Sequence, residues 1–396
     1  MMPADIVLAG AVRTAIGTFG GVFAEVPPQK LGSIAVAEAL KRAGVDPAQV
    51  DDVLMGNVIQ AGLRMNVARQ IAIQAGIPAG STAATINQAC ASGLRAVAMA
   101  AQQVSLGDSR IVVAGGVESM TRAPFLLSKA RHGYRMGNGQ LIDGMVEDGL
   151  ICGIEQYHMG LTAENVAAEM GITREEQDAF AEASQAKAAR AMELGLFKEE
   201  IVPVEVPQPK GPSVMVDRDE HPRPGTTAAR LATLKPAFKA DGSVTAGNAS
   251  GINDGAAALV VMAARTAEQM GVKPQARILG YAWAGVEPRV MGLGPVPAVR
   301  RVLEKTGLKL EDIELIELNE AFAAQSIGVL KQLKPDVARV NVNGGAVALG
   351  HPVGASGARI LVTLMYELAR RKAKLGLATL CVGGGQGIAM VVENLL

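Results

Sequence analysis

Cys90, one of three cysteines in the chain, lies in the segment QACASGLRA (88–96), just before an apolar helical pattern that begins at Leu94. Packing is the common role of a cysteine with apolar neighbours. A helix that starts near Ala91 points its backbone N–H groups and positive dipole end at the sulfur, which favours the thiolate and lowers the pKa of the thiol. The segment therefore indicates a nucleophile for a carbonyl carbon, with the N–H of Cys90 as a donor to the oxyanion.

Three further side chains with chemical potential stand beside glycines or at the ends of apolar runs. His351 lies between Gly350 and Pro352 in GGAVALGHPVGASGAR, where closely spaced glycines indicate a backbone bent around a polar side chain. Cys381 is the last residue of the strand-like run LGLATLC. It is either a second reactive thiol or a packing residue. Asn319 follows the strand-like LIEL, where it is either functional or a helix cap.

The glycine-rich segment GGGQG (383–387) raises the alternative of a phosphate-binding loop. A dinucleotide-binding loop opens a helix, whereas the strand-like IAMVVENLL follows this one. The order of elements therefore disfavours a nucleotide site.

The elements that must position these residues alternate along both ends of the chain. Residues 1–119 alternate short apolar runs with helical patterns, and the last 120 residues do the same. Such alternation is typical of an α/β layer architecture.

The two ends also match each other in register. GVDPAQVDDVLMGN, which begins at Gly44, resembles GLKLEDIELIELNE, which begins at Gly307, and ASGLR (91–95) resembles ASGAR (355–359). Both matches have nearly the same offset, which favours a duplicated half. We expect a first half made of 1–119 plus 246–274, an inserted loop domain over 120–245, and a second half over 275–396.

Composition limits the partners and the compartment. Lys plus Arg and Asp plus Glu both number 38, so the net charge offers no case for binding nucleic acid or an anionic membrane. Three cysteines without CxxC spacing fit a reducing compartment, and the scattered His132, His158, His221 and His351 predict no metal site. The start MMPADIVLAG has no leader pattern and no apolar run reaches the length of a membrane span, so we expect a cytoplasmic protein.

Four motifs together resemble the thiolase family: QACASG, NEAF, GHPVGASG and CVGGG, in the order and near the spacing of that family. The resemblance covers nearly the whole chain, with Ala91 as a mild departure where many relatives have Gly or Ser. It implies an α/β thiolase-like fold with two pseudo-symmetric βαβαβαββ halves in a layered αβαβα arrangement, and a loop domain inserted in the first half.

The resemblance also implies a role for each motif residue. Cys90 is expected to receive the acyl group, His351 to activate that thiol and bind the thioester oxygen, and Asn319 to hold a water that completes this oxyanion hole. Cys381 is expected to remove the α-proton of the second acetyl-CoA, with the N–H groups of Cys90 and Gly383 as the second oxyanion hole. A weakly acidic thioester α-proton needs such a base and such donors together, and covalent transfer predicts ping-pong kinetics.

The substrates implied are acetyl-CoA, acetoacetyl-CoA and CoA, with no permanently bound cofactor. The matching segments QYHMG, DEHPRPGTT, KPAF and TAGNASG suggest a CoA channel, and two further residues suggest an acyl pocket. The channel residues are Arg223, Ser250, Ala246, Phe238, His158 and Met159, and the pocket residues are Met291 and Phe322. Phe238 and Met159 fit an ordinary core equally well, and the motif around His158 resembles short-chain members.

The implied reaction is the reversible Claisen condensation of two acetyl-CoA into acetoacetyl-CoA and CoA through an acetyl-cysteine. The alternatives are a 3-ketoacyl-CoA thiolase of broader chain length and a catalytically silent scaffold or lipid-binding protein with the same fold. A basic run in TRAPFLLSKARHGYRMG (121–137) is by default a solvated loop, although the matching family region contacts CoA and joins dimers. We therefore expect a homotetramer, built as a dimer of dimers.

Overall fold

Two successions of strands and helices form the body of the protein, seen in a computed structural model that describes residues 5–208 and 210–396. Residues 1–4, which open the MMPADIVLAG segment and the first expected half, and residue 209 of the insertion lie outside this description. The first succession comprises β1 (Ile6–Thr14), β2 (Gly17–Thr18), α1 (Pro28–Ala43), η1 (Pro47–Gln49), β3 (Asp52–Gly56), α2 (Val67–Gln74), β4 (Thr82–Ile86), α3 (Ser92–Leu106), β5 (Ile111–Ser119), β11 (Asn253–Ala263) and α8 (Ala264–Met270). The second comprises β12 (Ala276–Gly285), η2 (Pro288–Leu293), α9 (Pro295–Thr306), η3 (Leu310–Asp312), β13 (Leu315–Leu318), α10 (Ala323–Leu333), η4 (Val337–Arg339), α11 (Ala346–Leu349), α12 (Val353–Arg371), β14 (Leu375–Val382) and β15 (Gln386–Asn394).

The second succession repeats the first in order. The series β1-α1-β3-α2-β4-α3-β5-β11 corresponds to β12-α9-β13-α10-α12-β14-β15, in which a single bridge from Val340 to Ile316 replaces the third strand. The matched glycines have the same role, since Gly44 ends α1 and Gly307 ends α9, with φ angles of 69° and 71°. The left-handed conformation at these caps suits glycine, so the duplicated sequence encodes duplicated helix ends.

One sheet runs through both halves in the described residues, in the order β13-β14-β15-β12-β1-β11-β5-β3-β4. Only two residue pairs join β1 to β12, Val7 with Arg277 and Leu8 with Ala276. The sheet therefore consists of one part from each half, joined at this short antiparallel seam.

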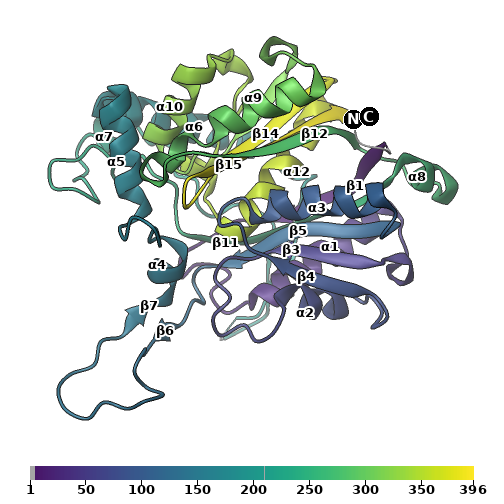
Figure 1. Cartoon of the computed structure of the whole chain (residues 1–396), viewed down its shortest axis with the longest axis horizontal. Coiled ribbons are helices and arrows are strands. Elements are labelled where there is room, and N and C mark those ends of the chain that lie inside the picture. Colours follow the sequence, from purple (N-terminus) through teal and green to yellow (C-terminus); the bar gives the residue numbers. More distant parts are fainter. Residues whose placement is uncertain (1–4, 209) are drawn as a thin grey trace.

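Helices cover and separate the two parts of the sheet (Figure 1). α1 and α2 pack on the outer face of the first part, α9 packs on the second, and α3 lies against α12 between them. The duplicated ASG segments meet there, because a Cβ on Gly93 would lie 2.8 Å from the amide nitrogen of Ala358 and one on Gly357 2.5 Å from that of Leu94. The absence of side chains thus lets the two central helices approach closely, and the layers follow the expected αβαβα order.

The insertion between β5 and β11 carries small elements of its own. They are β6 (Phe125–Leu126), β7 (Ile142–Asp143), α4 (Gly144–Gly149), α5 (Met159–Met170), α6 (Arg174–Glu193), β8 (Ile201–Val202), β9 (Val204–Val206), β10 (Val214–Val216) and α7 (Ala228–Leu231). β6 and β7 form a hairpin that projects from the body (Figure 1). The chain then returns through β11, which lies between β1 and β5.

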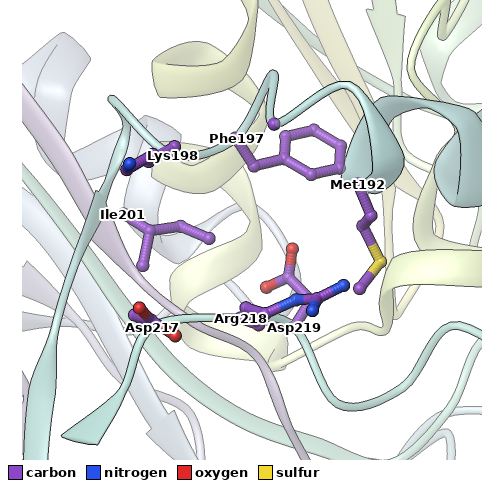
Figure 2. Close-up of a pocket in the computed structure, with 8 residues that line it drawn as sticks. Met192, Phe197, Lys198, Ile201, Asp217, Arg218 and Asp219 are labelled. Atoms are coloured by element: carbon purple, nitrogen blue, oxygen red, sulfur yellow. The ribbon is translucent and has the colours of Figure 1, made fainter.

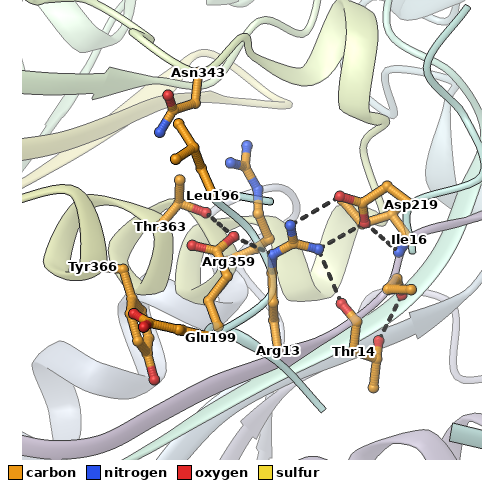
Figure 3. A network of polar contacts seen from close by, with 12 residues as sticks. Arg13, Thr14, Ile16, Leu196, Glu199, Asp219, Asn343, Arg359, Thr363 and Tyr366 are labelled. Atoms are coloured by element: carbon orange, nitrogen blue, oxygen red, sulfur yellow. Dashed lines mark hydrogen bonds and ion pairs between the residues drawn. The ribbon is translucent and has the colours of Figure 1, made fainter. Parts of the chain in front are cut away.

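A buried network of charges ties the insertion to both halves (Figure 3). Arg13 of β1 donates to Glu200 at 2.6 Å and to Asp219 at 2.7 and 2.9 Å, both from the insertion. Thr363 of α12 donates to the same Glu200 carboxylate at 3.1 Å. Because these charges are buried, loss of one partner would leave another uncompensated, and the network resists separation of the three parts.

Within the described ranges no helix is both long and apolar enough to cross a membrane. Over the same residues no three His, Cys, Asp or Glu side chains gather in a way that could hold a metal ion.

Candidate active site

Three of the four candidate reactive side chains lie at or just after the carboxyl ends of strands, and the fourth, His351, lies just before α12. Cys90 follows β4, Asn319 follows β13, and Cys381 is the last residue but one of β14. The Asn319 N–H donates to the carbonyl of Thr379 at 3.0 Å, which places Asn319 beside the end of β14. Carboxyl ends of strands are the usual place for a site in an α/β sheet.

A strained turn presents Cys90. Ala89 has a φ of +43°, which is uncommon for a residue with a side chain. Ser92 stabilises this turn, since its hydroxyl donates to the carbonyl of Ala89 at 2.6 Å and accepts the N–H of Gln88 at 2.9 Å. α3 begins at Ser92, so the half-buried thiol lies at the expected helix start.

The expectation of a lowered thiol pKa is wrong. Burial raises the pKa of Cys90 to about 11, and the backbone N–H groups of Gly383 and of Cys90 itself oppose this rise only in part. Removing a thiolate from water costs more here than the helix end and two donors return. The resting thiol is therefore protonated at neutral pH and needs a base.

His351 has the form of that base. Its Nδ1 lies 2.6 Å from the Ser356 hydroxyl, which donates to the carbonyl of Pro352 at 2.9 Å. A hydroxyl has a single proton, so this pattern leaves the imidazole proton on Nδ1 and the lone pair on Nε2. Nε2 is buried without a hydrogen-bond partner among the described residues. Burial, and secondarily the charge of Arg359, lowers the pKa of His351 to about 3, so the ring is neutral at working pH.

The loop before His351 depends on one asparagine and one glycine. The His351 N–H donates to Oδ1 of Asn253 at 2.9 Å, and Asn253 in turn donates to the carbonyl of Gly17 at 2.9 Å. Gly350 has a φ of +100°, and a Cβ there would overlap the Asn253 side chain. The glycine permits the contact that orients the histidine.

Asn319 carries a free amide. Both of its side-chain polar atoms are buried without a partner in the part of the chain that the structure describes. Its neighbour Glu320 is firmly held, since Ser184 and Asn341 each donate to its carboxylate at 2.7 Å. Unpaired buried polar groups cost stability, so an amide kept in this state is suited to bind an oxygen of a substrate or water.

Cys381 lies buried beside an apolar group of side chains. It belongs to one cluster with Met159, Met291 and Phe322. Burial raises the pKa of the Cys381 thiol, and the neighbouring Cys90 raises it further. A Cβ on Gly383 would lie 3.6 Å from both the sulfur of Met159 and the Cβ of Ala89, so Gly383 lies close to Met159 and to the residue that precedes Cys90.

Several predicted CoA-channel residues adjoin this cluster. The His158 ring stacks on Phe238 with centroids 4.6 Å apart, and Phe238 meets Phe322 edge-on at 6.1 Å. The N–H of Ser250 donates to the carbonyl of Ala321 at 3.0 Å. His158 also accepts the N–H of Gly160 at 3.0 Å at the start of α5, and burial lowers its pKa. These contacts bring His158 and Phe238 to Phe322, which is predicted to line an acyl pocket, and Ser250 to its neighbour Ala321.

Arg223 and Ala246 are exposed, and the structure does not bring their side chains into this cluster. Arg223 is held through its backbone, whose N–H donates to Gln185 at 2.8 Å and whose carbonyl accepts from Thr226 at 2.7 Å. Their predicted contact with CoA stays a prediction.

Sequence reasoning missed three residues that shape the site: Ser356, Asn253 and Glu118. Ser356 could have been found, since it lies in ASGAR one helical turn after the histidine loop. Glu118 had a weaker signal, as an acid at the end of the apolar run that forms β5. Asn253 had none, because it lies 98 residues from its partner His351.

A separate cavity of about 250 Å³ lies beside the charge network (Figure 2). Met192, Phe197 and Ile201 give it an apolar lining, and Asp219 joins it to the Arg13 network. None of the predicted site residues lines it. The candidate active site is therefore distinct from this cavity.

Comparison with protein families identifies two domains that together span the chain. The model of the thiolase N-terminal domain matches residues 6–265, and that of the thiolase C-terminal domain matches residues 272–394. Both matches agree with the resemblance inferred from the four motifs.

Individual relatives match over their full length. A protein of Syntrophomonas wolfei named acetyl-CoA acetyltransferase is 57% identical over 398 residues, with 100% of both chains covered. One of the same name from Escherichia coli K12 is 55% identical over 392 residues, 99% of each chain. The crystal structure of the Bacillus anthracis acetyl-CoA acetyltransferase superposes with a TM-score of 0.97 at 48% identity and 100% coverage of both chains, which confirms the expected fold.

Proposed function

The chain belongs to the thiolase family, and we propose that it is an acetyl-CoA C-acetyltransferase that joins two acetyl-CoA into acetoacetyl-CoA and CoA and runs the reverse thiolysis. The observation that carries this proposal is the buried, unpartnered Nε2 of a neutral His351, in a chain that also presents a protonated thiol at Cys90. A second thiol, Cys381, lies beside the first. An acyltransferase with a covalent step and a proton-transfer step needs these groups.

In the first half-reaction Nε2 of His351 takes the proton of Cys90, and the thiolate attacks the thioester carbon. The oxygen of the tetrahedral intermediate then accepts two hydrogen bonds. One comes from the new Nε2–H of His351 and the other from the water that Asn319 is expected to hold. Collapse expels the CoA thiolate, which takes the proton from His351. The acetyl group is left on Cys90 and the histidine is neutral again.

In the second half-reaction Cys381 acts on another acetyl-CoA. Cys381 releases its thiol proton to water, and its thiolate removes the α-proton. The resulting carbanion attacks the acetyl carbonyl on Cys90, and collapse of the adduct expels the Cys90 thiolate, which takes a proton from water. We assign the Gly383 and Cys90 N–H groups, which lower the pKa of Cys90 in the resting protein, as the donors to the oxyanion formed there.

We expect a preference for a short acyl chain, since Met159, Met291 and Phe322 pack closely around Cys381. Thiolysis of acetoacetyl-CoA is expected to exceed that of the six-carbon homologue by at least about tenfold in kcat/KM, because each added methylene must displace these side chains. Steady-state kinetics over a series of 3-ketoacyl-CoA lengths measures this. If kcat/KM instead stays equal or rises with chain length, the protein is a 3-ketoacyl-CoA thiolase of broad range. If no chain length is turned over, it is the catalytically silent scaffold.

We also propose a homotetramer, a dimer of dimers. The β6–β7 hairpin projects from the body (Figure 1) and, with its flanks, exposes the apolar side chains of Phe125, Leu127, Met136 and Leu141. β4 forms an edge of the sheet, which is a common place for pairing between subunits. Sedimentation equilibrium is expected to give four times the 40.9 kDa chain mass, and shortening the hairpin is expected to give dimers. A monomeric wild-type protein contradicts the proposal.

A cytoplasmic location stays a prediction from composition.

A further inference from the structure

The N-terminus of α12 has no cap of its own. Its N-cap residue Pro352 makes no side-chain capping bond, and the first turn carries no acid. Instead, the N–H of Gly354 donates to Oε2 of Glu118 at 3.0 Å, and Glu118 belongs to β5 in the other half. The first N–H groups of a helix lack partners within the helix and carry its positive end, so a carboxylate there is stabilising. Glu118 thus caps α12 across the boundary between the halves.

Three more donors hold the same carboxylate. Oε2 also accepts the N–H of Val58 at 2.9 Å, while Oε1 accepts the side-chain amide of Asn57 at 2.8 Å and the N–H of Ile59 at 3.3 Å. Glu118 is fully buried, and its four bonds leave it one position. The carboxylate therefore links the segment 57–59 of the first half to the start of α12.

The segments that Glu118 links flank the nucleophile. Val58, Ile59 and Val353 belong to one apolar cluster, and Cys90 packs against it. Gly354, which donates to Glu118, lies three residues after His351. One side of the link therefore supports the nucleophile and the other side the base.

Close contacts between backbones give this arrangement little freedom. A Cβ on Gly116 would overlap the carbonyl oxygen of Gly354, and one on Gly56 would lie 2.7 Å from it. A Cβ on Gly354 would lie 2.7 Å from Oε2 of Glu118. Because Gly56, Gly116 and Gly354 have no side chains that could yield, a shift of the Glu118 carboxylate passes to the histidine loop.

Resting on the proposed function, we propose that Glu118 is a positioning residue for acetyl transfer, whose carboxylate holds the start of α12, and with it His351, against Cys90. Small misplacements of reacting groups slow a reaction strongly even when the altered residue touches no substrate. Glu118 acts through the geometry of the pair that transfers the proton.

The charge of Glu118 supplies an independent readout. Burial raises the pKa of Glu118 to about 8, its three backbone donors oppose the rise, and Asp254 of β11 adds to it. The ionised carboxylate in turn raises the pKa of Cys90, while Cys381 faces that thiol from β14. At pH 9 Glu118 is ionised, so removal of its charge is expected to increase the thiolate fraction of Cys90.

The test compares wild type with Glu118→Gln at pH 9. Acetyl transfer from acetyl-CoA to Cys90, followed by quenched-flow mass spectrometry, is expected to slow about 100-fold with little change in KM. Alkylation of Cys90 by iodoacetamide is expected to become faster, since its pKa falls. Unfolding would also speed alkylation, so the buried Cys152 serves as the internal reporter and must stay unlabelled.

Asp254→Asn is the matched control. It neutralises a neighbouring buried acid, Asp254, whose carboxylate accepts a hydrogen bond from the N–H of Thr121 at 3.0 Å. The N-terminus of α12 bonds to Glu118 instead, so this variant leaves that link in place. This variant is expected to transfer acetyl groups within a few-fold of the wild-type rate. Glu118→Gln as fast as wild type, or Asp254→Asn as slow as Glu118→Gln, overturns the positioning role. Failure of the wild type to acetylate Cys90 would refute the proposed function instead.

A second variant covers the case in which Glu118→Gln does not fold. Asn57→Ala removes the 2.8 Å side-chain bond to the carboxylate and retains its charge. Acetyl transfer is expected to slow, though by less than in Glu118→Gln. The alkylation rate of Cys90 is expected to stay near that of wild type. A folded, fully active Asn57→Ala protein contradicts the role of Glu118.

Discussion

Cys90→Ser is expected to abolish acetylation of the protein by acetyl-CoA. This is the largest effect expected of any single substitution. His351 is a weak base, since burial lowers its pKa to about 3, and a serine hydroxyl is far less acidic than a thiol. The same histidine that activates Cys90 therefore cannot activate serine at a useful rate. The loss in turnover is expected to be on the order of 10⁶-fold, the scale on which covalent enzymes depend on their nucleophile.

Mass spectrometry of the intact protein and of its peptides after incubation with acetyl-CoA measures this. Wild type is expected to carry one acetyl group, located on Cys90. Cys152→Ser is the matched control, because Cys152 is equally a cysteine but lies buried at the start of the segment before α5. An acetyl group found on another residue of the folded Cys90→Ser protein refutes the assignment of the nucleophile.

Cys381→Ser is expected to separate the two half-reactions. Cys90, His351 and Asn319 all remain, so the acetyl-enzyme should still form. Condensation and thiolysis should fall by about 10²–10⁴-fold, the usual contribution of a general acid or base. The pKa of a serine hydroxyl is too high for it to take the α-proton of a thioester in the buried position of Cys381.

Two measurements on the same variant distinguish the roles of the thiols. Peptide mass spectrometry follows the acetyl-enzyme, and exchange of the acetyl methyl protons with deuterated water follows proton removal. We expect acetylation to persist and exchange to be lost. The opposite pattern, exchange without acetylation, would show that Cys381 is the nucleophile and Cys90 the base.

Motifs with local structural meaning could be interpreted from the sequence. Gly44 and Gly307 mark equivalent helix ends because a left-handed cap favours glycine wherever it occurs. QACASG and GHPVGASG could each be placed at the start of a helix, and α3 and α12 begin within them. Such features depend on a few consecutive residues, and one sequence is sufficient to predict them.

The protonation states of the site could not be predicted in this way. The helix start at Ser92 is where the sequence placed it, yet the Cys90 pKa rises to about 11. The helix end is a local feature, whereas burial of the sulfur depends on β14, the 57–59 segment and the start of α12 folding around it. The tautomer of His351 likewise depends on Ser356 and Pro352, whose geometry appears only once α12 has formed.

The sequence by itself thus determined the duplicated α/β framework, the four candidate reactive side chains and the family to which the chain belongs. Tertiary structure alone decided which thiol form rests in the site, which nitrogen of His351 is free, and that Glu118 joins the halves behind them. The physical reason is the range of the interactions. Helix caps and strand patterns arise from neighbours in the chain, whereas desolvation and the bond from Gly354 to Glu118, 236 residues apart, require the folded halves to meet.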